Sequence, residues 1–198
     1  MKKTSLFLSL ITLYILTSSS NCRKSNSPTN QLPPETHAGL NTMGCTVNGE
    51  IFIPQTKSTP GSAPGPFSVA GYNIPGPGIS FHWTNYNDSS LSWIDIHVDS
   101  VDLQAGTTYT LGAPADTTNV ITPNTTAKAQ WALYYSVSGN VIPSFAYRTN
   151  SQVTGQIILD YYDSLNGLVA GRFTFDAVNN SGDTVHVREG RFDMAIQR

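Results

Sequence analysis

Strict alternation of apolar and polar residues is the feature that most constrains this chain. Ile79, Phe81 and Trp83 alternate with polar residues, and residues 94–99 repeat the pattern. Successive side chains of a strand point to opposite faces of a sheet, so a period of two marks strands with one buried face. No stretch after residue 21 shows a sustained helical stripe. The chain is therefore predicted to be all-β.

The C-terminal part of the chain shows three such strands in succession. The predicted strands span about 152–163, 168–178 and 184–197. Short connections between them predict an antiparallel, three-stranded meander. In the last strand the apolar positions change from odd numbers at Val187 to even numbers at Phe192. One extra residue produces such a change, which predicts a β-bulge or sharp bend near Glu189 and Gly190.

Three further segments complete the predicted architecture. Asn48 and Gly49 form the dipeptide preferred in type I′ turns, so a tight hairpin is expected there. Residues 56–77 are rich in Pro and Gly and are predicted to be loop, with at most a short strand at 67–72. A strand at 129–137 is expected to turn its odd-numbered side chains, Trp131, Leu133, Tyr135 and Val137, toward the core. The favoured fold is an antiparallel β-sandwich, with a lipocalin-like barrel as the alternative.

The N-terminus has the pattern of an export signal. Lys2 and Lys3 precede an apolar run at 6–16, which is too short for a membrane-spanning helix and typical of a signal peptide. Residues 1–21 are therefore expected to be removed. Residues 22–42 are polar and Pro-rich and are predicted to be a flexible tether, and residues 43–198 are sufficient for a single β-domain.

Cys22 stands where a bacterial lipoprotein carries its lipid anchor. The small residues before it resemble a lipobox, although Ser19 and Asn21 are unusual at their positions. Cys22 is expected to be acylated, with chains such as palmitate, and to hold the protein in the cell envelope at the outer membrane. The alternative is ordinary cleavage nearby, which would leave Cys22 able to pair with Cys45 in an oxidising compartment.

The charge balance excludes one class of partner. Removal of Lys2 and Lys3 leaves nine basic residues against thirteen acidic ones, a formal net charge of −4. Nucleic-acid binding relies on clustered Lys and Arg, and the basic residues here are scattered. The expected partners are the lipid bilayer, through Cys22, and a glycan or an envelope protein.

The candidate ligand-binding residues lie mainly on one predicted strand. Asp95, His97 and Asp99 share a face at two-residue spacing, and Trp93 belongs to the same face. Metal sites need ligands from several elements, and the sequence nominates no second element, so a solvated face is the simpler interpretation and no metal is predicted. Trp93 and Tyr134, with these carboxylates and the imidazole, suit a sugar ring, but ordinary strand packing explains them as well.

No catalytic residue or cofactor is assigned from the sequence. It contains no Gly-x-Ser-x-Gly turn, and Cys45 has no nearby base. The preferred function is a non-catalytic binding or assembly role in the cell envelope. A carbohydrate-binding module and an envelope hydrolase are the alternatives.

Two motifs resemble those of a known family. One comprises Asn41, Thr42, Met43, Gly44 and Cys45, followed by Val47, Asn48 and Gly49. The other comprises Gly171, Phe173, Phe175, Gly190, Arg191, Phe192 and Asp193. Together they are similar to a family of Bacteroidetes-type lipoproteins of unknown function. The resemblance implies export, lipidation and a β-rich domain, and it assigns no functional residue.

Overall fold

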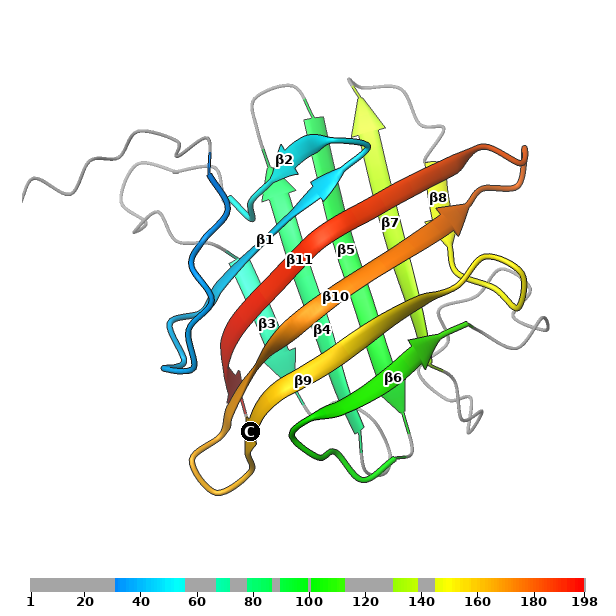
Figure 1. Ribbon diagram of the computed structural model, residues 1–198. Coiled ribbons are helices and arrows are strands. Elements are labelled where there is room, and N and C mark those ends of the chain that lie inside the picture. Colours follow the sequence, from blue (N-terminus) through cyan, green and yellow to red (C-terminus); the bar gives the residue numbers. More distant parts are fainter. Residues whose placement is uncertain are drawn as a thin grey trace, which may run out of the picture.

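The computed structural model describes residues 31–55, 67–71, 78–86, 90–99, 101–112, 130–138 and 145–197. These residues form eleven strands and no helix, so the all-β prediction is confirmed (Figure 1). The strands are β1 (Thr42–Val47), β2 (Glu50–Phe52), β3 (Phe67–Gly71), β4 (Gly78–Tyr86), β5 (Ser90–Asp99), β6 (Thr107–Leu111), β7 (Gln130–Ser138), β8 (Phe145–Arg148), β9 (Gly155–Asp163), β10 (Leu168–Val178) and β11 (Thr184–Gln197). The signal peptide and Cys22 lie outside the described residues. Within the described part of the chain, no helix has the length and apolarity needed to cross a membrane.

One continuous sheet folds over itself into two layers. The front layer holds β2, β1, β11, β10, β9 and β6 in this order, and the back layer holds β3, β4, β5, β7 and β8. The strands of the two layers cross steeply (Figure 1). The layers join at two corners, where Ile196 of β11 pairs with Ala70 of β3 and Val178 of β10 pairs with Arg148 of β8. The sheet is thus nearly closed, with features of both predicted architectures.

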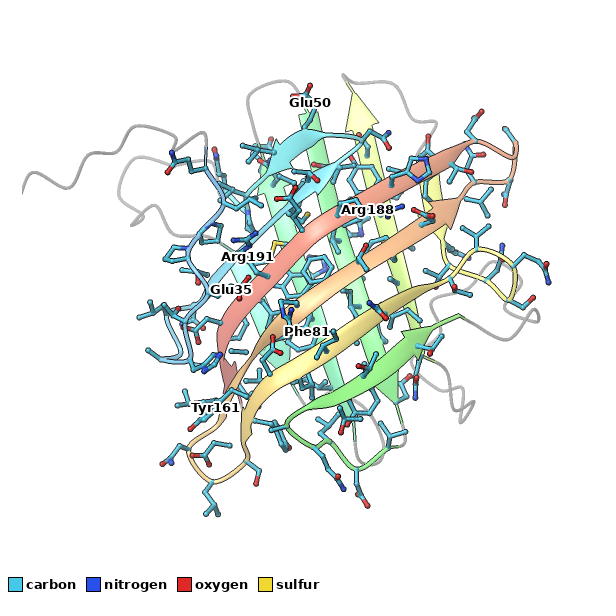
Figure 2. The ribbon with its side chains drawn as sticks, in the orientation of Figure 1. Glu35, Glu50, Phe81, Tyr161, Arg188 and Arg191 are labelled. Atoms are coloured by element: carbon cyan, nitrogen blue, oxygen red, sulfur yellow. The ribbon has the colours of Figure 1, made fainter. Side chains whose placement is uncertain are left out.

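The core fills the space between the layers and is rich in aromatic rings. Trp83 stacks on Phe81 with ring centroids 5.1 Å apart, and on Phe173 from the opposite layer at 5.4 Å. Phe192 packs against both Phe81 and Trp83. Figure 2 shows Phe81 between the layers, where it is fully buried. Offset and tilted ring pairs of this kind stabilise a core beyond their buried area alone.

The local sequence predictions are confirmed at the hairpin, the meander and the bulge. Asn48 and Gly49 have φ values of 51° and 87°, as a type I′ turn requires. The strands β9, β10 and β11 form the antiparallel meander. The register of β11 shifts against both β10 and β1 around Glu189, which has a φ of 54°. The extra residue reverses the parity of β11, as the sequence indicates.

The predicted orientation of β7 is wrong. Tyr134 lies opposite Ile94 and packs on the core, whereas Tyr135 lies opposite Trp93 on the outer face. The two faces of this strand are almost equally apolar, so periodicity could not decide between them. The pairing of β7 with β5 determines which face of β7 is buried. Ile94 of β5 is fully buried, and the residue directly opposite it, Tyr134, must face inward as well. The side chain of Trp131 is outside the described part.

Residues 31–41, assigned to the tether by the sequence, lie on the outer side of the front layer as a strap. The carboxylate of Asp193, only 1% exposed, accepts hydrogen bonds from Thr36 Oγ1 at 2.6 Å, Ala38 N at 3.0 Å and Gly39 N at 2.7 Å. The ring of His37 stacks on Tyr161 at 5.4 Å. Part of the predicted tether therefore packs on the domain ahead of residue 43.

Candidate functional site

The structure places four of the five sequence-predicted ligand residues together. Trp93, Asp95, His97 and Asp99 occupy alternate positions of β5, and the residues between them are buried in the core. They therefore lie on the outer face of the back layer. Tyr134 does not join them. It faces the interior, where its ring lies 6.1 Å from that of Tyr147.

A polar chain runs across β4 and β5 on this outer face. His82 of β4 lies directly opposite Asp95, and its Nδ1 is 2.5 Å from the Asp95 carboxylate. The other ring nitrogen of His82 is 2.9 Å from the hydroxyl of Thr84. The side chain of His82 is 43% exposed and that of Asp95 only 13%. The carboxylate thus fixes the orientation of an imidazole that solvent and ligands can reach.

This hydroxyl, imidazole and carboxylate chain has the connectivity of a hydrolase triad but lacks its setting. Acyl transfer also needs donors aimed at the developing oxyanion. Thr84 lies in the middle of the sheet, between Phe67 of β3 and Trp93 of β5. Its carbonyl also accepts a hydrogen bond from Gln55 N at 3.0 Å. Because the surrounding backbone is engaged in pairing, we interpret the chain as a fixed set of hydrogen-bonding groups.

His97 and Asp99 are shifted toward their neutral forms. Burial lowers the pKa of His97, and His82 lowers it further, while Asp95 raises it. Burial raises the pKa of Asp99 to about 6. One carboxylate oxygen of Asp99 has no hydrogen-bond partner among the described residues. No cluster of three or more metal-ligating side chains occurs in the described ranges.

An aromatic pair lies beside this polar chain. Trp93 and Tyr135 are directly paired across β5 and β7, and their rings stack with centroids 3.7 Å apart and planes 19° apart. Both side chains are partly buried. The sequence indicates Trp93 as a candidate ligand-binding residue but not Tyr135. The reason is that Tyr135 is expected from the sequence to face the core, whereas it lies on the outer face. Only the cross-strand register brings the two rings together.

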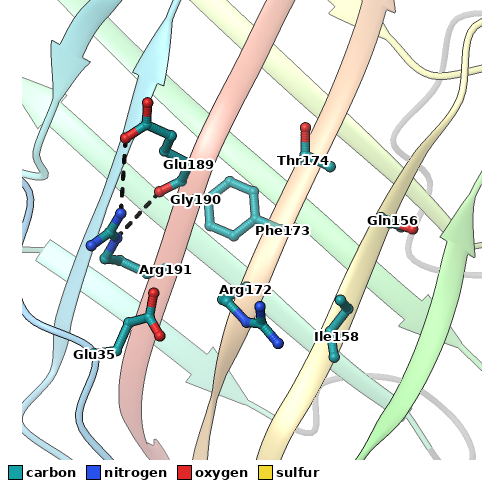
Figure 3. A pocket seen from close by; sticks show the side chains of 9 residues that line it. All are labelled: Glu35, Gln156, Ile158, Arg172, Phe173, Thr174, Glu189, Gly190 and Arg191. Carbon is teal, nitrogen blue, oxygen red and sulfur yellow. Dashed lines mark hydrogen bonds and ion pairs between the residues drawn. The ribbon is translucent and has the colours of Figure 1, made fainter.

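A second feature, which the sequence did not predict, is a hollow on the outer side of the front layer (Figure 3). It encloses ≈ 220 Å³ above the β-bulge, between β9, β10, β11 and the strap. It is lined by Glu35, Gln156, Ile158, Arg172, Phe173, Thr174, Glu189, Gly190 and Arg191. Figure 2 shows Arg191 and Glu35 close together on this side of the molecule. Its polar residues come from the strap and from three different strands, so no local motif in the sequence predicts it.

Comparison with known proteins does not assign a function to the outer face of the back layer or to the hollow. The resemblance to a lipoprotein family therefore stays a prediction. No protein-family model matches the chain, and neither do the curated proteins or the solved structures with which it was compared.

Proposed function

We propose that this protein is a non-catalytic binding protein of the cell envelope that binds a sugar ring on the outer face of its back layer. The observation that carries the proposal is the Trp93–Tyr135 stack beside the fixed His82–Asp95 pair. An aromatic surface attracts the apolar face of a sugar ring, while nearby carboxylate and imidazole groups hydrogen-bond to its hydroxyls. Binding sites commonly combine apolar contact with a few positioned polar groups in this way.

The proposal includes export and a lipid anchor at Cys22. The arguments are the short apolar run at 6–16 and the state of Cys45, the alternative partner of Cys22. Among the described residues Cys45 is unpaired, it is fully buried between the layers, and burial raises the pKa of its thiol. A disulfide with Cys22 would have to form inside the core. Mass spectrometry of the mature protein should find an acylated N-terminal Cys22, and an unmodified Cys22 would refute the anchor.

The sugar-binding proposal is tested with purified full-length protein on a glycan array, followed by calorimetry on the best ligand. Trp93→Ala should weaken binding about tenfold or more, because it removes roughly 1.5 kcal/mol of aromatic contact. Asp95→Asn keeps the shape of the side chain but loses the charge that orients His82, and it should weaken binding as well.

Tyr161→Ala is the matched control, since Tyr161 is another stacked aromatic but lies on the front layer beside the strap. It should bind as the wild type does. Absence of glycan binding by the wild type, or equal binding by the wild type and Trp93→Ala, would contradict the proposal.

A further inference from the structure

Two arginines face each other at the hollow of the front layer. Arg172 of β10 and Arg191 of β11 are direct cross-strand partners, and both line the hollow. Like charges directly opposite each other destabilise a sheet unless other groups compensate them. The way in which each guanidinium is compensated therefore shows which of them is available to a ligand.

Arg172 is held by a carboxylate within its own sheet. Its Nε and one terminal nitrogen donate to the two oxygens of Asp160 at 2.9 and 2.8 Å. This bidentate geometry is the strongest that an arginine and a carboxylate form. Arg172 is thus committed to Asp160 and serves mainly as a wall of the hollow.

Arg191 is more buried than Arg172 yet less well paired. Its side chain is 24% exposed, compared with 51% for Arg172. Within the described part of the chain, its nearest carboxylate is that of Glu189, at 3.9 Å, and this side chain is 65% exposed. The Nε of Arg191 donates to the backbone carbonyl of Glu189 at a long 3.4 Å. A guanidinium has five N–H donors in a planar fork, and these contacts use little of that capacity.

The remaining walls of the hollow supply hydrogen-bonding groups of both kinds. Glu35 of the strap accepts, and Gln156 both donates and accepts. The Thr174 hydroxyl donates to the carbonyl of Val187 at 2.9 Å, so it offers a ligand an acceptor. The four charged lining residues, Glu35, Arg172, Glu189 and Arg191, have a formal net charge of zero, and Asp160, which pairs with Arg172, makes the local balance −1. The hollow therefore does not attract anions over long range. Its preference for one ligand must come from direct contacts with the lining residues.

From this arrangement we propose that the hollow binds a compact hydroxy-carboxylate, the chemistry of a uronic acid residue. The carboxylate of the ligand meets the fork of Arg191, and its hydroxyls meet Glu35, Gln156 and Thr174. The volume of ≈ 220 Å³ is below the roughly 300–1,000 Å³ of sites for drug-sized ligands, which limits the occupant to one small group. The site lies on the opposite layer from Trp93, so it does not depend on the proposed sugar-binding face.

The test is calorimetric titration of the full-length protein with D-glucuronate and, separately, with D-glucose. We expect glucuronate to bind at least about tenfold more tightly than glucose, since only the former offers a carboxylate to Arg191. Arg191→Gln should weaken glucuronate binding about tenfold to a hundredfold. Near-ultraviolet circular dichroism would verify that the variant is folded.

Two control variants separate this site from its surroundings and from the Trp93 face. Arg188→Gln removes a guanidinium from the same strand that does not line the hollow and that pairs with Asp176 instead. Arg188→Gln and Trp93→Ala should both bind glucuronate within about twofold of the wild type. Equal affinity for glucuronate and glucose, or wild-type affinity in Arg191→Gln, would overturn the proposal. So would loss of glucuronate binding in Arg188→Gln.

Discussion

The contact between the strap and Asp193 makes a quantitative prediction possible. One oxygen of Asp193 accepts from Thr36 Oγ1 and Ala38 N, and the other accepts from Gly39 N. Burial alone would raise the pKa of this carboxyl, but these hydrogen bonds, with the backbone of Leu40, outweigh it, and the pKa is lowered. The folded protein therefore holds Asp193 as an anion. Substitution by Asn keeps the shape of the side chain and removes the charge.

The cost of Asp193→Asn follows from the count of donors. An amide oxygen can replace one carboxylate oxygen, so the bonds from Thr36 and Ala38 can survive, without charge assistance. The amide nitrogen then faces Gly39 N, and a donor opposes a donor in a buried place. One buried unsatisfied donor costs about 1–3 kcal/mol, and weakening of two charge-assisted bonds adds about 1 kcal/mol. We expect the free energy of strap detachment to fall by about 2–4 kcal/mol.

Hydrogen exchange with mass spectrometry measures this effect directly. The amides of Ala38 and Gly39 should exchange about 30-fold to several hundredfold faster in Asp193→Asn, while those of β10 should change little. Asp160→Asn is the matched control, because it removes a carboxylate from the same layer that pairs with Arg172, whereas the described hydrogen bonds of the strap donors go to Asp193. Unchanged exchange of the strap in Asp193→Asn would refute the argument that Asp193 holds it.

Two further predictions concern stability. Because burial raises the pKa of Asp99 from its ordinary 3.8 to about 6, ionised Asp99 opposes folding, and this cost grows as the pH rises from about 4 to above 6. Asp99→Asn should therefore be more stable than the wild type by about 1 kcal/mol at pH of about 8, a value reduced by solvent screening, and no more stable at pH of about 3. Urea unfolding at both pH values checks this, and an equal difference at both would contradict it. Gly190→Ala would bring a Cβ to 2.5–2.6 Å from the ring of Phe173, and should destabilise the fold by about 1–3 kcal/mol. A double-mutant cycle with Phe173→Leu should recover part of the loss, and additive effects would argue against the clash.

Local chemistry explains which parts of the fold could be predicted. The hairpin at Asn48 depends on two residues that tolerate positive φ, and the bulge at Glu189 follows from a change of parity within one strand. Both signals are contained in a few consecutive residues. The same holds for the shared outer face of Trp93 and Asp95, because alternation within β5 is enough to set it.

The features that escaped prediction depend on contacts between distant segments. The polar composition of residues 31–41 predicts a tether, since nothing in those residues reveals that a buried carboxylate more than 150 positions later will bind them. Tyr135 reaches Trp93 only through the register of β7 against β5. The hollow likewise requires Arg191 and Glu35 to be brought together across the front layer. Register and docking are properties of the assembled sheet.

The strap also bears on how the protein would stand at a membrane. With an anchor at Cys22, the strap would shorten the reach of the predicted tether, because residues 36–39 are held against Asp193 instead of extending away from the domain. The strap lies on the front layer, where Pro33 packs over Gly44. The hollow would therefore lie on the layer to which the anchor is tied, and the Trp93 face would lie on the other. Two proposed sugar sites on opposite layers would allow one anchored molecule to contact two glycan chains at once, a geometry suited to an assembly role.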